Sequence, residues 1–181
     1  MGELEYGVAS SCAIGLNTRL TPEQSEQFQG PRTIRRLLAT ATTIAVVGLS
    51  TESTKASNMV ASYLQDEGYR IIPVNPRATE ILGEECYPDL LSIPEKVDIV
   101  DIFRPASEVA GIVDQAIQIG ARAVWMQLRI IDLAAAQKAK DAGLEAIVDK
   151  CIKMEHGRFG GRLHWAGMNT EVISARRRKA S

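Results

Sequence analysis

Residues 44–55, with the sequence IAVVGLSTESTK, constrain the fold of this chain more than any other segment. Four apolar residues that predict a buried strand precede Gly48, a short polar turn and an amphipathic helix that starts near Ala56. Glycine lets the backbone approach a ligand closely, and the free N–H groups at a helix start attract anions. The segment therefore predicts a cradle for a nucleotide phosphate, with a plain strand–helix connection as the alternative.

This turn departs from the fingerprint of dinucleotide-binding domains, which is G-x-G-x-x-G with a carboxylate about 20 residues later. Ser50 and Ser53 take the second and third glycine positions, and the next predicted strand ends in Val74-Asn75-Pro76 without a carboxylate. An NAD(P)-binding oxidoreductase or redox sensor is therefore the alternative function and not the preferred one.

Strand and helix patterns alternate along the chain. Strands are predicted at 44–47, 69–74, 97–103, 123–128 and 144–148, and helices at 56–67, 107–119 and 132–142. This alternation predicts an α/β fold with a doubly wound parallel sheet, a Rossmann-like sheet with helices on both faces. Two earlier helices are predicted to start at Thr21-Pro22 and at Pro31, and residues 81–87 form a short edge strand or an ordered loop.

The length of 181 residues suits one domain. We expect an N-terminal extension over residues 1–30, the folded domain over 31–174 and a basic tail over 175–181, which contains Arg176-Arg177-Arg178-Lys179. Such a tail could contact nucleic acid or an acidic partner. Because no DNA-reading module accompanies it, we expect no nucleic-acid ligand.

The composition, 45% hydrophobic and 5% aromatic with a net charge of −1, suits a soluble globular protein with an aliphatic core. No apolar stretch is long enough to span a membrane and no signal-peptide pattern is present, so we expect a cytoplasmic protein.

The cysteines and histidines have neither disulfide nor metal-ligand spacing, and we expect no metal. They are Cys12, Cys86, Cys151, His156 and His164.

Ligands of doubly wound sheets bind outside the carboxyl ends of the strands. The predicted strand ends of this chain carry cations, namely Lys55, Arg77, Arg104, Arg129 and Lys150. We therefore expect an anionic ligand.

The order of motifs at these ends resembles a known family. VGLS, YLQDEGYRIIPVNPRATEILGEECYPDLLSIPEKVDIVDIFRP, VWMQL and VDKCIKMEHGR are similar to segments of the stand-alone CoA-binding proteins, relatives of the CoA-binding domain of the succinyl-CoA synthetase alpha subunit. The resemblance covers roughly residues 32–174 and rests on several ordered motifs. It implies a Rossmann-like CoA-binding fold, with coenzyme A or an acyl-CoA lying across the strand ends.

The resemblance also implies cofactor-binding residues at each strand end. The pyrophosphate would be surrounded by Gly48, Ser50, Lys55, Ser57 and Asn58, with Leu49 in the same turn. The adenosine phosphates would lie along Asn75, Pro76 and Arg77, and the adenine would be flanked by Phe103 and Arg104. The later strand ends would contribute Gln127 and Cys151.

Other interpretations of single residues stay open. Phe103 could pack in the core, Arg77 could be a solvated cation, and Trp125 is expected in the core. Arg129 stands where the family is expected to carry glycine, and its side chain would narrow the pantetheine channel or add a phosphate contact.

We expect no catalytic residues. The synthetase relatives use a phosphorylated histidine on a second domain and an ATP-grasp module, and this chain is too short for either.

Glu155 and His156 could form an acid/base pair, but a surface turn is the preferred interpretation. Lys150 and Lys153 would favour the thiolate of Cys151 and a mixed disulfide with CoA, but a half-buried, inert cysteine is the preferred interpretation. The expected function is non-catalytic CoA binding, with an enzyme as a possible partner.

Overall fold

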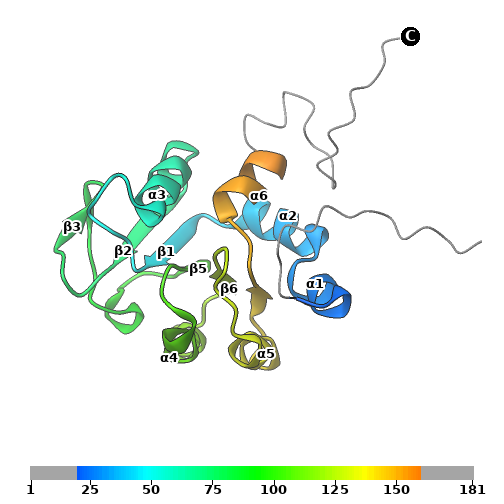
Figure 1. Cartoon of the computed structure of the whole chain (residues 1–181). Coiled ribbons are helices and arrows are strands. Elements are labelled where there is room, and N and C mark those ends of the chain that lie inside the picture. The colour runs from blue at the N-terminus through cyan, green and yellow to red at the C-terminus, as the bar shows by residue number, and fades with distance from the viewer. Residues whose placement is uncertain (1–19, 160–181) are drawn as a thin grey trace, which may run out of the picture.

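The computed structural model describes residues 20–159. They form a five-stranded parallel sheet in the order β2-β1-β5-β6-β7 (Figure 1). The strands are β1 (Thr43–Val47), β2 (Arg70–Val74), β5 (Ile99–Ile102), β6 (Ala123–Met126) and β7 (Glu145–Ile147). The α/β fold predicted from the alternating pattern is confirmed, and each predicted strand is present: β1 starts one residue earlier than predicted, and the other four are shorter.

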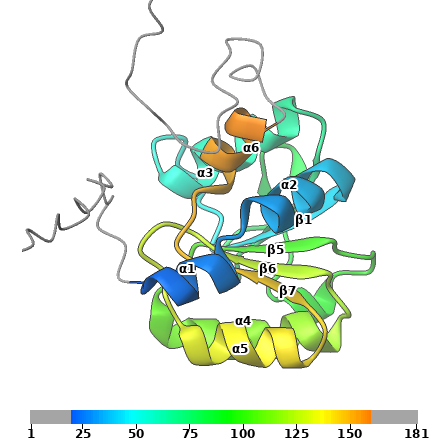
Figure 2. The same cartoon turned by 90° about the vertical axis from the view of Figure 1, so that its right-hand side faces the viewer.

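Helices cover both faces of the sheet (Figure 2). One face carries α4 (Ala106–Gln118) and α5 (Leu133–Asp141), and the other carries α2 (Pro31–Thr40), α3 (Ala56–Asp66) and α6 (Ile152–Phe159). Residues 80–85 form a small hairpin of β3 (Glu80–Ile81) and β4 (Glu84–Glu85), Tyr87 then forms an isolated parallel bridge with Val74, and η1 (Leu90–Ser92) leads to β5. Within residues 20–159, no helix has the length and apolar character of a membrane span.

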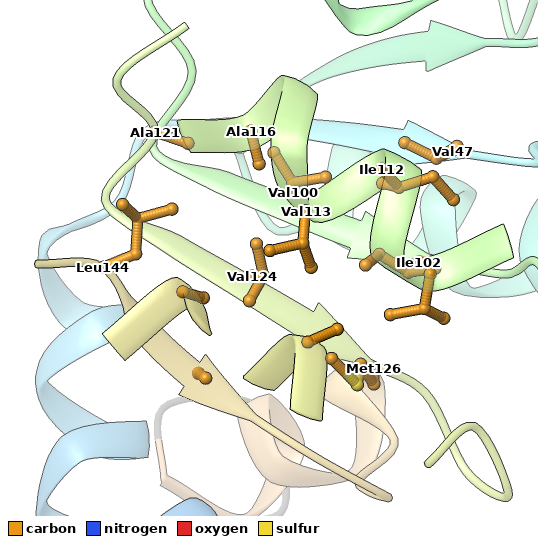
Figure 3. Close-up of a cluster of buried hydrophobic side chains, with 14 of the residues drawn as sticks. Val47, Val100, Ile102, Ile112, Val113, Ala116, Ala121, Val124, Met126 and Leu144 are labelled. Atoms are coloured by element: carbon orange, nitrogen blue, oxygen red, sulfur yellow. The ribbon is translucent and has the colours of Figure 1, made fainter. Parts of the chain in front are cut away.

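An apolar stripe of α4 packs against the centre of the sheet. Val113 and Ala116 of α4 lie over Val100 of β5 and Val124 of β6 (Figure 3). Every residue of β1, β5 and β6 is buried, because helices shield both faces of a parallel sheet from water. The runs of apolar residues in the sequence follow from this two-sided burial.

Helix α1 (Pro22–Phe28) starts as the sequence predicts, because the side chains of Thr21 and Gln24 each accept a hydrogen bond from the other's backbone N–H. Phe28 is 2% exposed and joins the core beneath α4 and α5. The N–H of Val148 donates to the carbonyl of Phe28 at 3.2 Å. Residues 20–29 of the predicted extension therefore pack on the domain, whereas residues 1–19 and the basic tail lie outside the described residues.

The prediction of a surface turn at Glu155 and His156 is wrong. Both residues are buried in α6, at 4% and 8% exposure. The Glu155 carboxylate accepts from Arg158 at 3.0 Å, and Nδ1 of His156 lies 3.0 Å from the hydroxyl of Tyr63. Polar partners thus satisfy both side chains inside the helix layer, which a hydrophobicity pattern cannot reveal.

Phe28→Ala should lower the free energy of unfolding by about 3–5 kcal/mol, because it removes a buried ring between α1 and the core. Glu26→Ala, an exposed change in the same helix, should cost less than about 0.5 kcal/mol. Urea denaturation of the two variants and the wild-type protein measures both values. Equal small losses would mean that α1 contributes nothing to the folded domain.

Candidate functional site

A cleft of about 440 Å³ opens at the carboxyl ends of β1 and β2. The strand order reverses here, since β2 lies on one side of β1 and β5 on the other, and such switch points are the usual ligand sites of α/β sheets. The lining residues that the sequence had suggested are Gly48, Ser50, Asn75, Pro76, Arg77 and Arg104. The other lining residues, which the sequence had not suggested, are Val47, Val74, Pro88, Asp89, Glu108, Ile112 and Gln115.

Gly48 allows two strand-end turns to touch. Its φ of +85° is a left-handed conformation that side chains disfavour. A β-carbon at this position would lie 2.8 Å from Cδ of Arg104 and 3.0 Å from the carbonyl oxygen of Phe103. The sequence suggested that glycine here lets a ligand approach, and the structure shows that the neighbouring turn already requires it.

The turn after β1 is fixed by the first residues of α3. Oγ of Ser57 accepts from the N–H of Ser50 at 3.1 Å, and Nδ2 of Asn58 donates to the carbonyl of Ser50 at 2.8 Å. Both side chains are buried, so they shape the turn from behind. Lys55, the N-cap residue of α3, makes no side-chain capping bond, so the first N–H groups of the helix stay available to an anion.

Asn75 joins the turns that follow β1 and β2. Its Nδ2 donates to the carbonyl of Leu49 at 2.8 Å, while its Oδ1 accepts from the N–H of Arg77 at 2.9 Å. Leu49 has a fully buried side chain, so only its backbone belongs to the turn surface. The thiol of Cys86 donates to the carbonyl of Asn75 at 3.4 Å, and burial raises the pKa of this thiol. The amide of Asn75 is thus engaged at both ends.

The three cations near the cleft differ in how far their charge is neutralised. Arg104 donates two hydrogen bonds of 2.8 Å to Glu108, which raise the pKa of Arg104 and lower that of Glu108. Lys55 lies 3.7 Å from Glu52, an exposed pair of little strength. The guanidinium of Arg77 is exposed and has no partner among residues 20–159. Arg77 is therefore the cleft cation best able to bind a new anion.

Other suggested residues lie outside the cleft lining. Phe103 is half-buried against the core formed by α2, α3 and α6. Gln127 is 4% exposed and donates to Oδ1 of Asp101 at 2.8 Å. Trp125 is fully buried, as predicted, and its indole N–H donates to the carbonyl of Lys150 at 2.7 Å.

Cys151 is half-buried, in agreement with the preferred interpretation of an inert cysteine, and its surroundings do not favour a thiolate. Burial raises the pKa of Cys151, and the nearby Asp101 adds to this effect, although backbone N–H groups of α6 and the charge of Lys153 oppose it. Lys150 lies 3.9 Å from Glu155, and Lys153 lies over the ring of Tyr63. The structure therefore favours the protonated thiol.

Asp101 is a fully buried carboxyl group in β5. Its Oδ1 accepts from Gln127, but its Oδ2 has no hydrogen-bond partner in the described part of the chain. Burial raises the pKa of Asp101 to about 7, and the bond from Gln127 only partly offsets this. The sequence did carry a signal, because an aspartate inside the apolar run IVDIF must be buried when both sheet faces are covered.

The cleft residues missed by sequence reasoning come from α4 and from the loop before η1. Glu108, Ile112 and Gln115 have the i, i+4, i+7 spacing of one helical face, so the spacing alone could have found them. Pro88 and Asp89 lie in a loop without periodicity, and nothing in their local sequence indicates a cleft.

Asp101 should make stability fall as pH rises. The folded pKa of about 7 exceeds the unfolded value of about 3.9, so the contribution of the protonated group is full below pH 4 and is lost between about pH 4 and 7. Asp101→Asn keeps an acceptor for Gln127 and does not titrate. Urea denaturation at several pH values should show this decline in the wild-type protein and not in the variant. Parallel pH profiles would contradict the assignment.

The chain is similar to known proteins over most of this fold. It matches the CoA binding domain family over residues 42–157. It is 37% identical to the Bacillus subtilis (strain 168) uncharacterized protein YneT over 123 residues, 68% of this chain and 91% of YneT. A hypothetical protein from Pyrococcus horikoshii OT3 has a similar structure, with a TM-score of 0.69 and 39% identity over 71% of this chain and 91% of that one.

A larger enzyme shares part of the chain. The ADP-forming acetate–CoA ligase I of Archaeoglobus fulgidus is 39% identical over 72 residues, which are 40% of this chain and 10% of the ligase. Because the family match covers well over half of the residues, this chain belongs to the family of CoA-binding domains.

Proposed function

We propose that this protein binds coenzyme A or an acyl-CoA at the carboxyl ends of its strands, without catalysing a reaction. The observation that carries the proposal is that two anion-binding features face one cleft. One is the unpaired guanidinium of Arg77, and the other is the turn that leads to the uncapped start of α3. CoA brings a pyrophosphate and a separate 3′-phosphate, and the two features provide one anion site for each. Family membership and the CoA ligase relative support the same ligand.

In this arrangement the pyrophosphate lies at the start of α3, beside Gly48, Ser50 and Lys55. Ser57 and Asn58 hold the turn in shape through their bonds to Ser50. Arg77, after Asn75 and Pro76, takes the 3′-phosphate. Arg104 lies beside the adenine, with Phe103 behind it, and Ile112 provides an apolar wall. Gln127 and Cys151 mark the direction of the pantetheine arm.

The alternative, NAD(P) binding, would need a carboxylate free to bind the ribose hydroxyls. Two carboxylates line the cleft: both oxygens of Glu108 bind Arg104, and Asp89 is partly engaged, since its Oδ1 accepts from the N–H and the hydroxyl of Ser92. Asn75 occupies the strand end where dinucleotide-binding domains place the acidic residue. The existing bonds of these carboxylates, and the amide at this strand end, favour CoA over NAD(P).

A non-catalytic role agrees with the chemistry of the described residues. Oγ of Ser50 accepts from the N–H of Glu52 and Oγ of Ser57 accepts from the N–H of Ser50, and within residues 20–159 neither hydroxyl donates to a carboxylate or imidazole that could act as a general base. The pKa of Cys151 is raised, which disfavours a thiolate nucleophile. We propose a cytoplasmic carrier, a sensor or a binding partner of an enzyme, with no role in nucleic-acid binding.

CoA should raise the melting temperature, and NAD should do so weakly or not at all. At a hundred times its Kd a ligand adds about 2.7 kcal/mol, which for a chain of this size is roughly 5–10 °C. Differential scanning fluorimetry with CoA, NAD and NADP at equal concentrations measures the shifts. Equal shifts with all three would remove the preference for CoA.

Arg77→Ala should weaken CoA binding by about 1.5–3 kcal/mol, because a charge-assisted bond to phosphate is lost. Binding of dephospho-CoA, which lacks the 3′-phosphate, should change little. Isothermal titration calorimetry of both ligands measures the difference, with Arg35→Ala, an exposed arginine of α2, as the control variant. The same loss for both ligands would show that Arg77 does not bind the 3′-phosphate.

A further inference from the structure

Arg129, directly after β6, adopts an unfavourable backbone conformation. Its φ is +66°, in the left-handed region where every residue with a β-carbon is disfavoured and glycine is not. Asp149 lies in the corresponding turn after β7 and has a φ of +56°. Strained residues of this kind persist where the surrounding structure holds them, and they concentrate at functional sites.

A hydrogen bond between the two turns holds this conformation. The N–H of Arg129 donates to Oδ1 of Asp149 at 2.6 Å, and Asp149 is buried. This bond uses the backbone of Arg129 only, so glycine could make it equally well. The arginine side chain therefore needs a separate explanation.

The guanidinium of Arg129 is exposed and has no ion pair or hydrogen bond within residues 20–159. Lys150, the cation in the neighbouring turn after β7, is engaged, since it lies 3.9 Å from Glu155. Leu128, next to Arg129, is 52% exposed. The turn after β6 thus presents an unpaired cation beside an apolar side chain.

The turn is within reach of a CoA bound as proposed above. Adjacent strands are about 4.8 Å apart, so the end of β6, two strands from β1, is about 10 Å from the pyrophosphate site. The pantetheine arm has the backbone length of about four residues and extends to about 14 Å. Its sulfur, and an acyl group on that sulfur, can therefore reach the turns after β6 and β7.

Resting on that proposed function, we propose that Arg129 selects CoA thioesters whose acyl group ends in a free carboxylate. A guanidinium binds a carboxylate through two parallel hydrogen bonds, whereas an alkyl chain offers it no partner. Leu128 can pack against the methylene groups between thioester and carboxylate. The preferred ligand class is a short dicarboxylic acyl-CoA, unlike the acetyl group named in the ligase relatives.

Two ligand pairs of matched chain length test this preference: glutaryl-CoA against pentanoyl-CoA, and malonyl-CoA against propionyl-CoA. The wild-type protein should bind the carboxylated member of at least one pair about tenfold more tightly. Arg129→Gln should abolish this difference and leave the affinity for free CoA unchanged. Arg35→Gln, which changes an exposed arginine of α2, should preserve the difference.

Arg129→Gly provides a second measurement. It should also abolish the preference, and it should raise the melting temperature because glycine relieves the left-handed strain. Equal wild-type affinities within both pairs, or a preference that survives Arg129→Gln, would overturn the inference while CoA binding stands. Failure to bind any CoA compound would overturn the proposed function and this inference together.

Discussion

The contact between the turns after β1 and β5 determines the shape of the ligand edge. A β-carbon on Gly48 would lie only 2.8 Å from Cδ of Arg104 and 3.0 Å from the carbonyl oxygen of Phe103, so this position favours glycine. This contact sets the position of Arg104, which is then held by Glu108 of the following helix. The N–H of Gly48 also bonds to the carbonyl of Val74, so three neighbouring strand ends meet at one residue. The cleft depends on this junction.

The rest of the ligand edge consists of polar groups that bind one another in advance of any ligand. The backbone of the turn after β1 is hydrogen-bonded by the side chains of Ser57, Asn58 and Asn75. Ordering these loops therefore costs nothing further when a ligand arrives. Within residues 20–159, the cations of this edge left without partners are Arg77 and Arg129, which lie in turns on opposite sides of β1. A long ligand with anionic groups at both ends matches this distribution better than a compact one.

The sequence was sufficient to predict the fold because each element carries its own pattern. The stripe of Val109, Val113 and Ala116 and the uninterrupted apolar strands reflect burial, which depends on the residue and its near neighbours. The burial of Glu155 and His156 in α6 was missed because it depends on packing: Arg158 of the same helix pairs with Glu155, and Tyr63 of the distant α3 pairs with His156. The same reason limits prediction of the site. A sequence shows that Arg77, Arg104 and Lys55 are cations, but only the packed structure shows which of them are already paired.

Both polar atoms of the Asn75 side chain are hydrogen-bonded, and this limits how such a cleft could change its ligand during evolution. A single Asn-to-Asp change would create the acidic residue that dinucleotide-binding domains carry at this strand end. It would also remove the Nδ2 donor and set a carboxylate against the carbonyl oxygen of Leu49. The repulsion would disturb the turn that forms the phosphate cradle. The Asn-to-Asp variant would thus be destabilised, and a switch of nucleotide would require the turn and the strand end to change together.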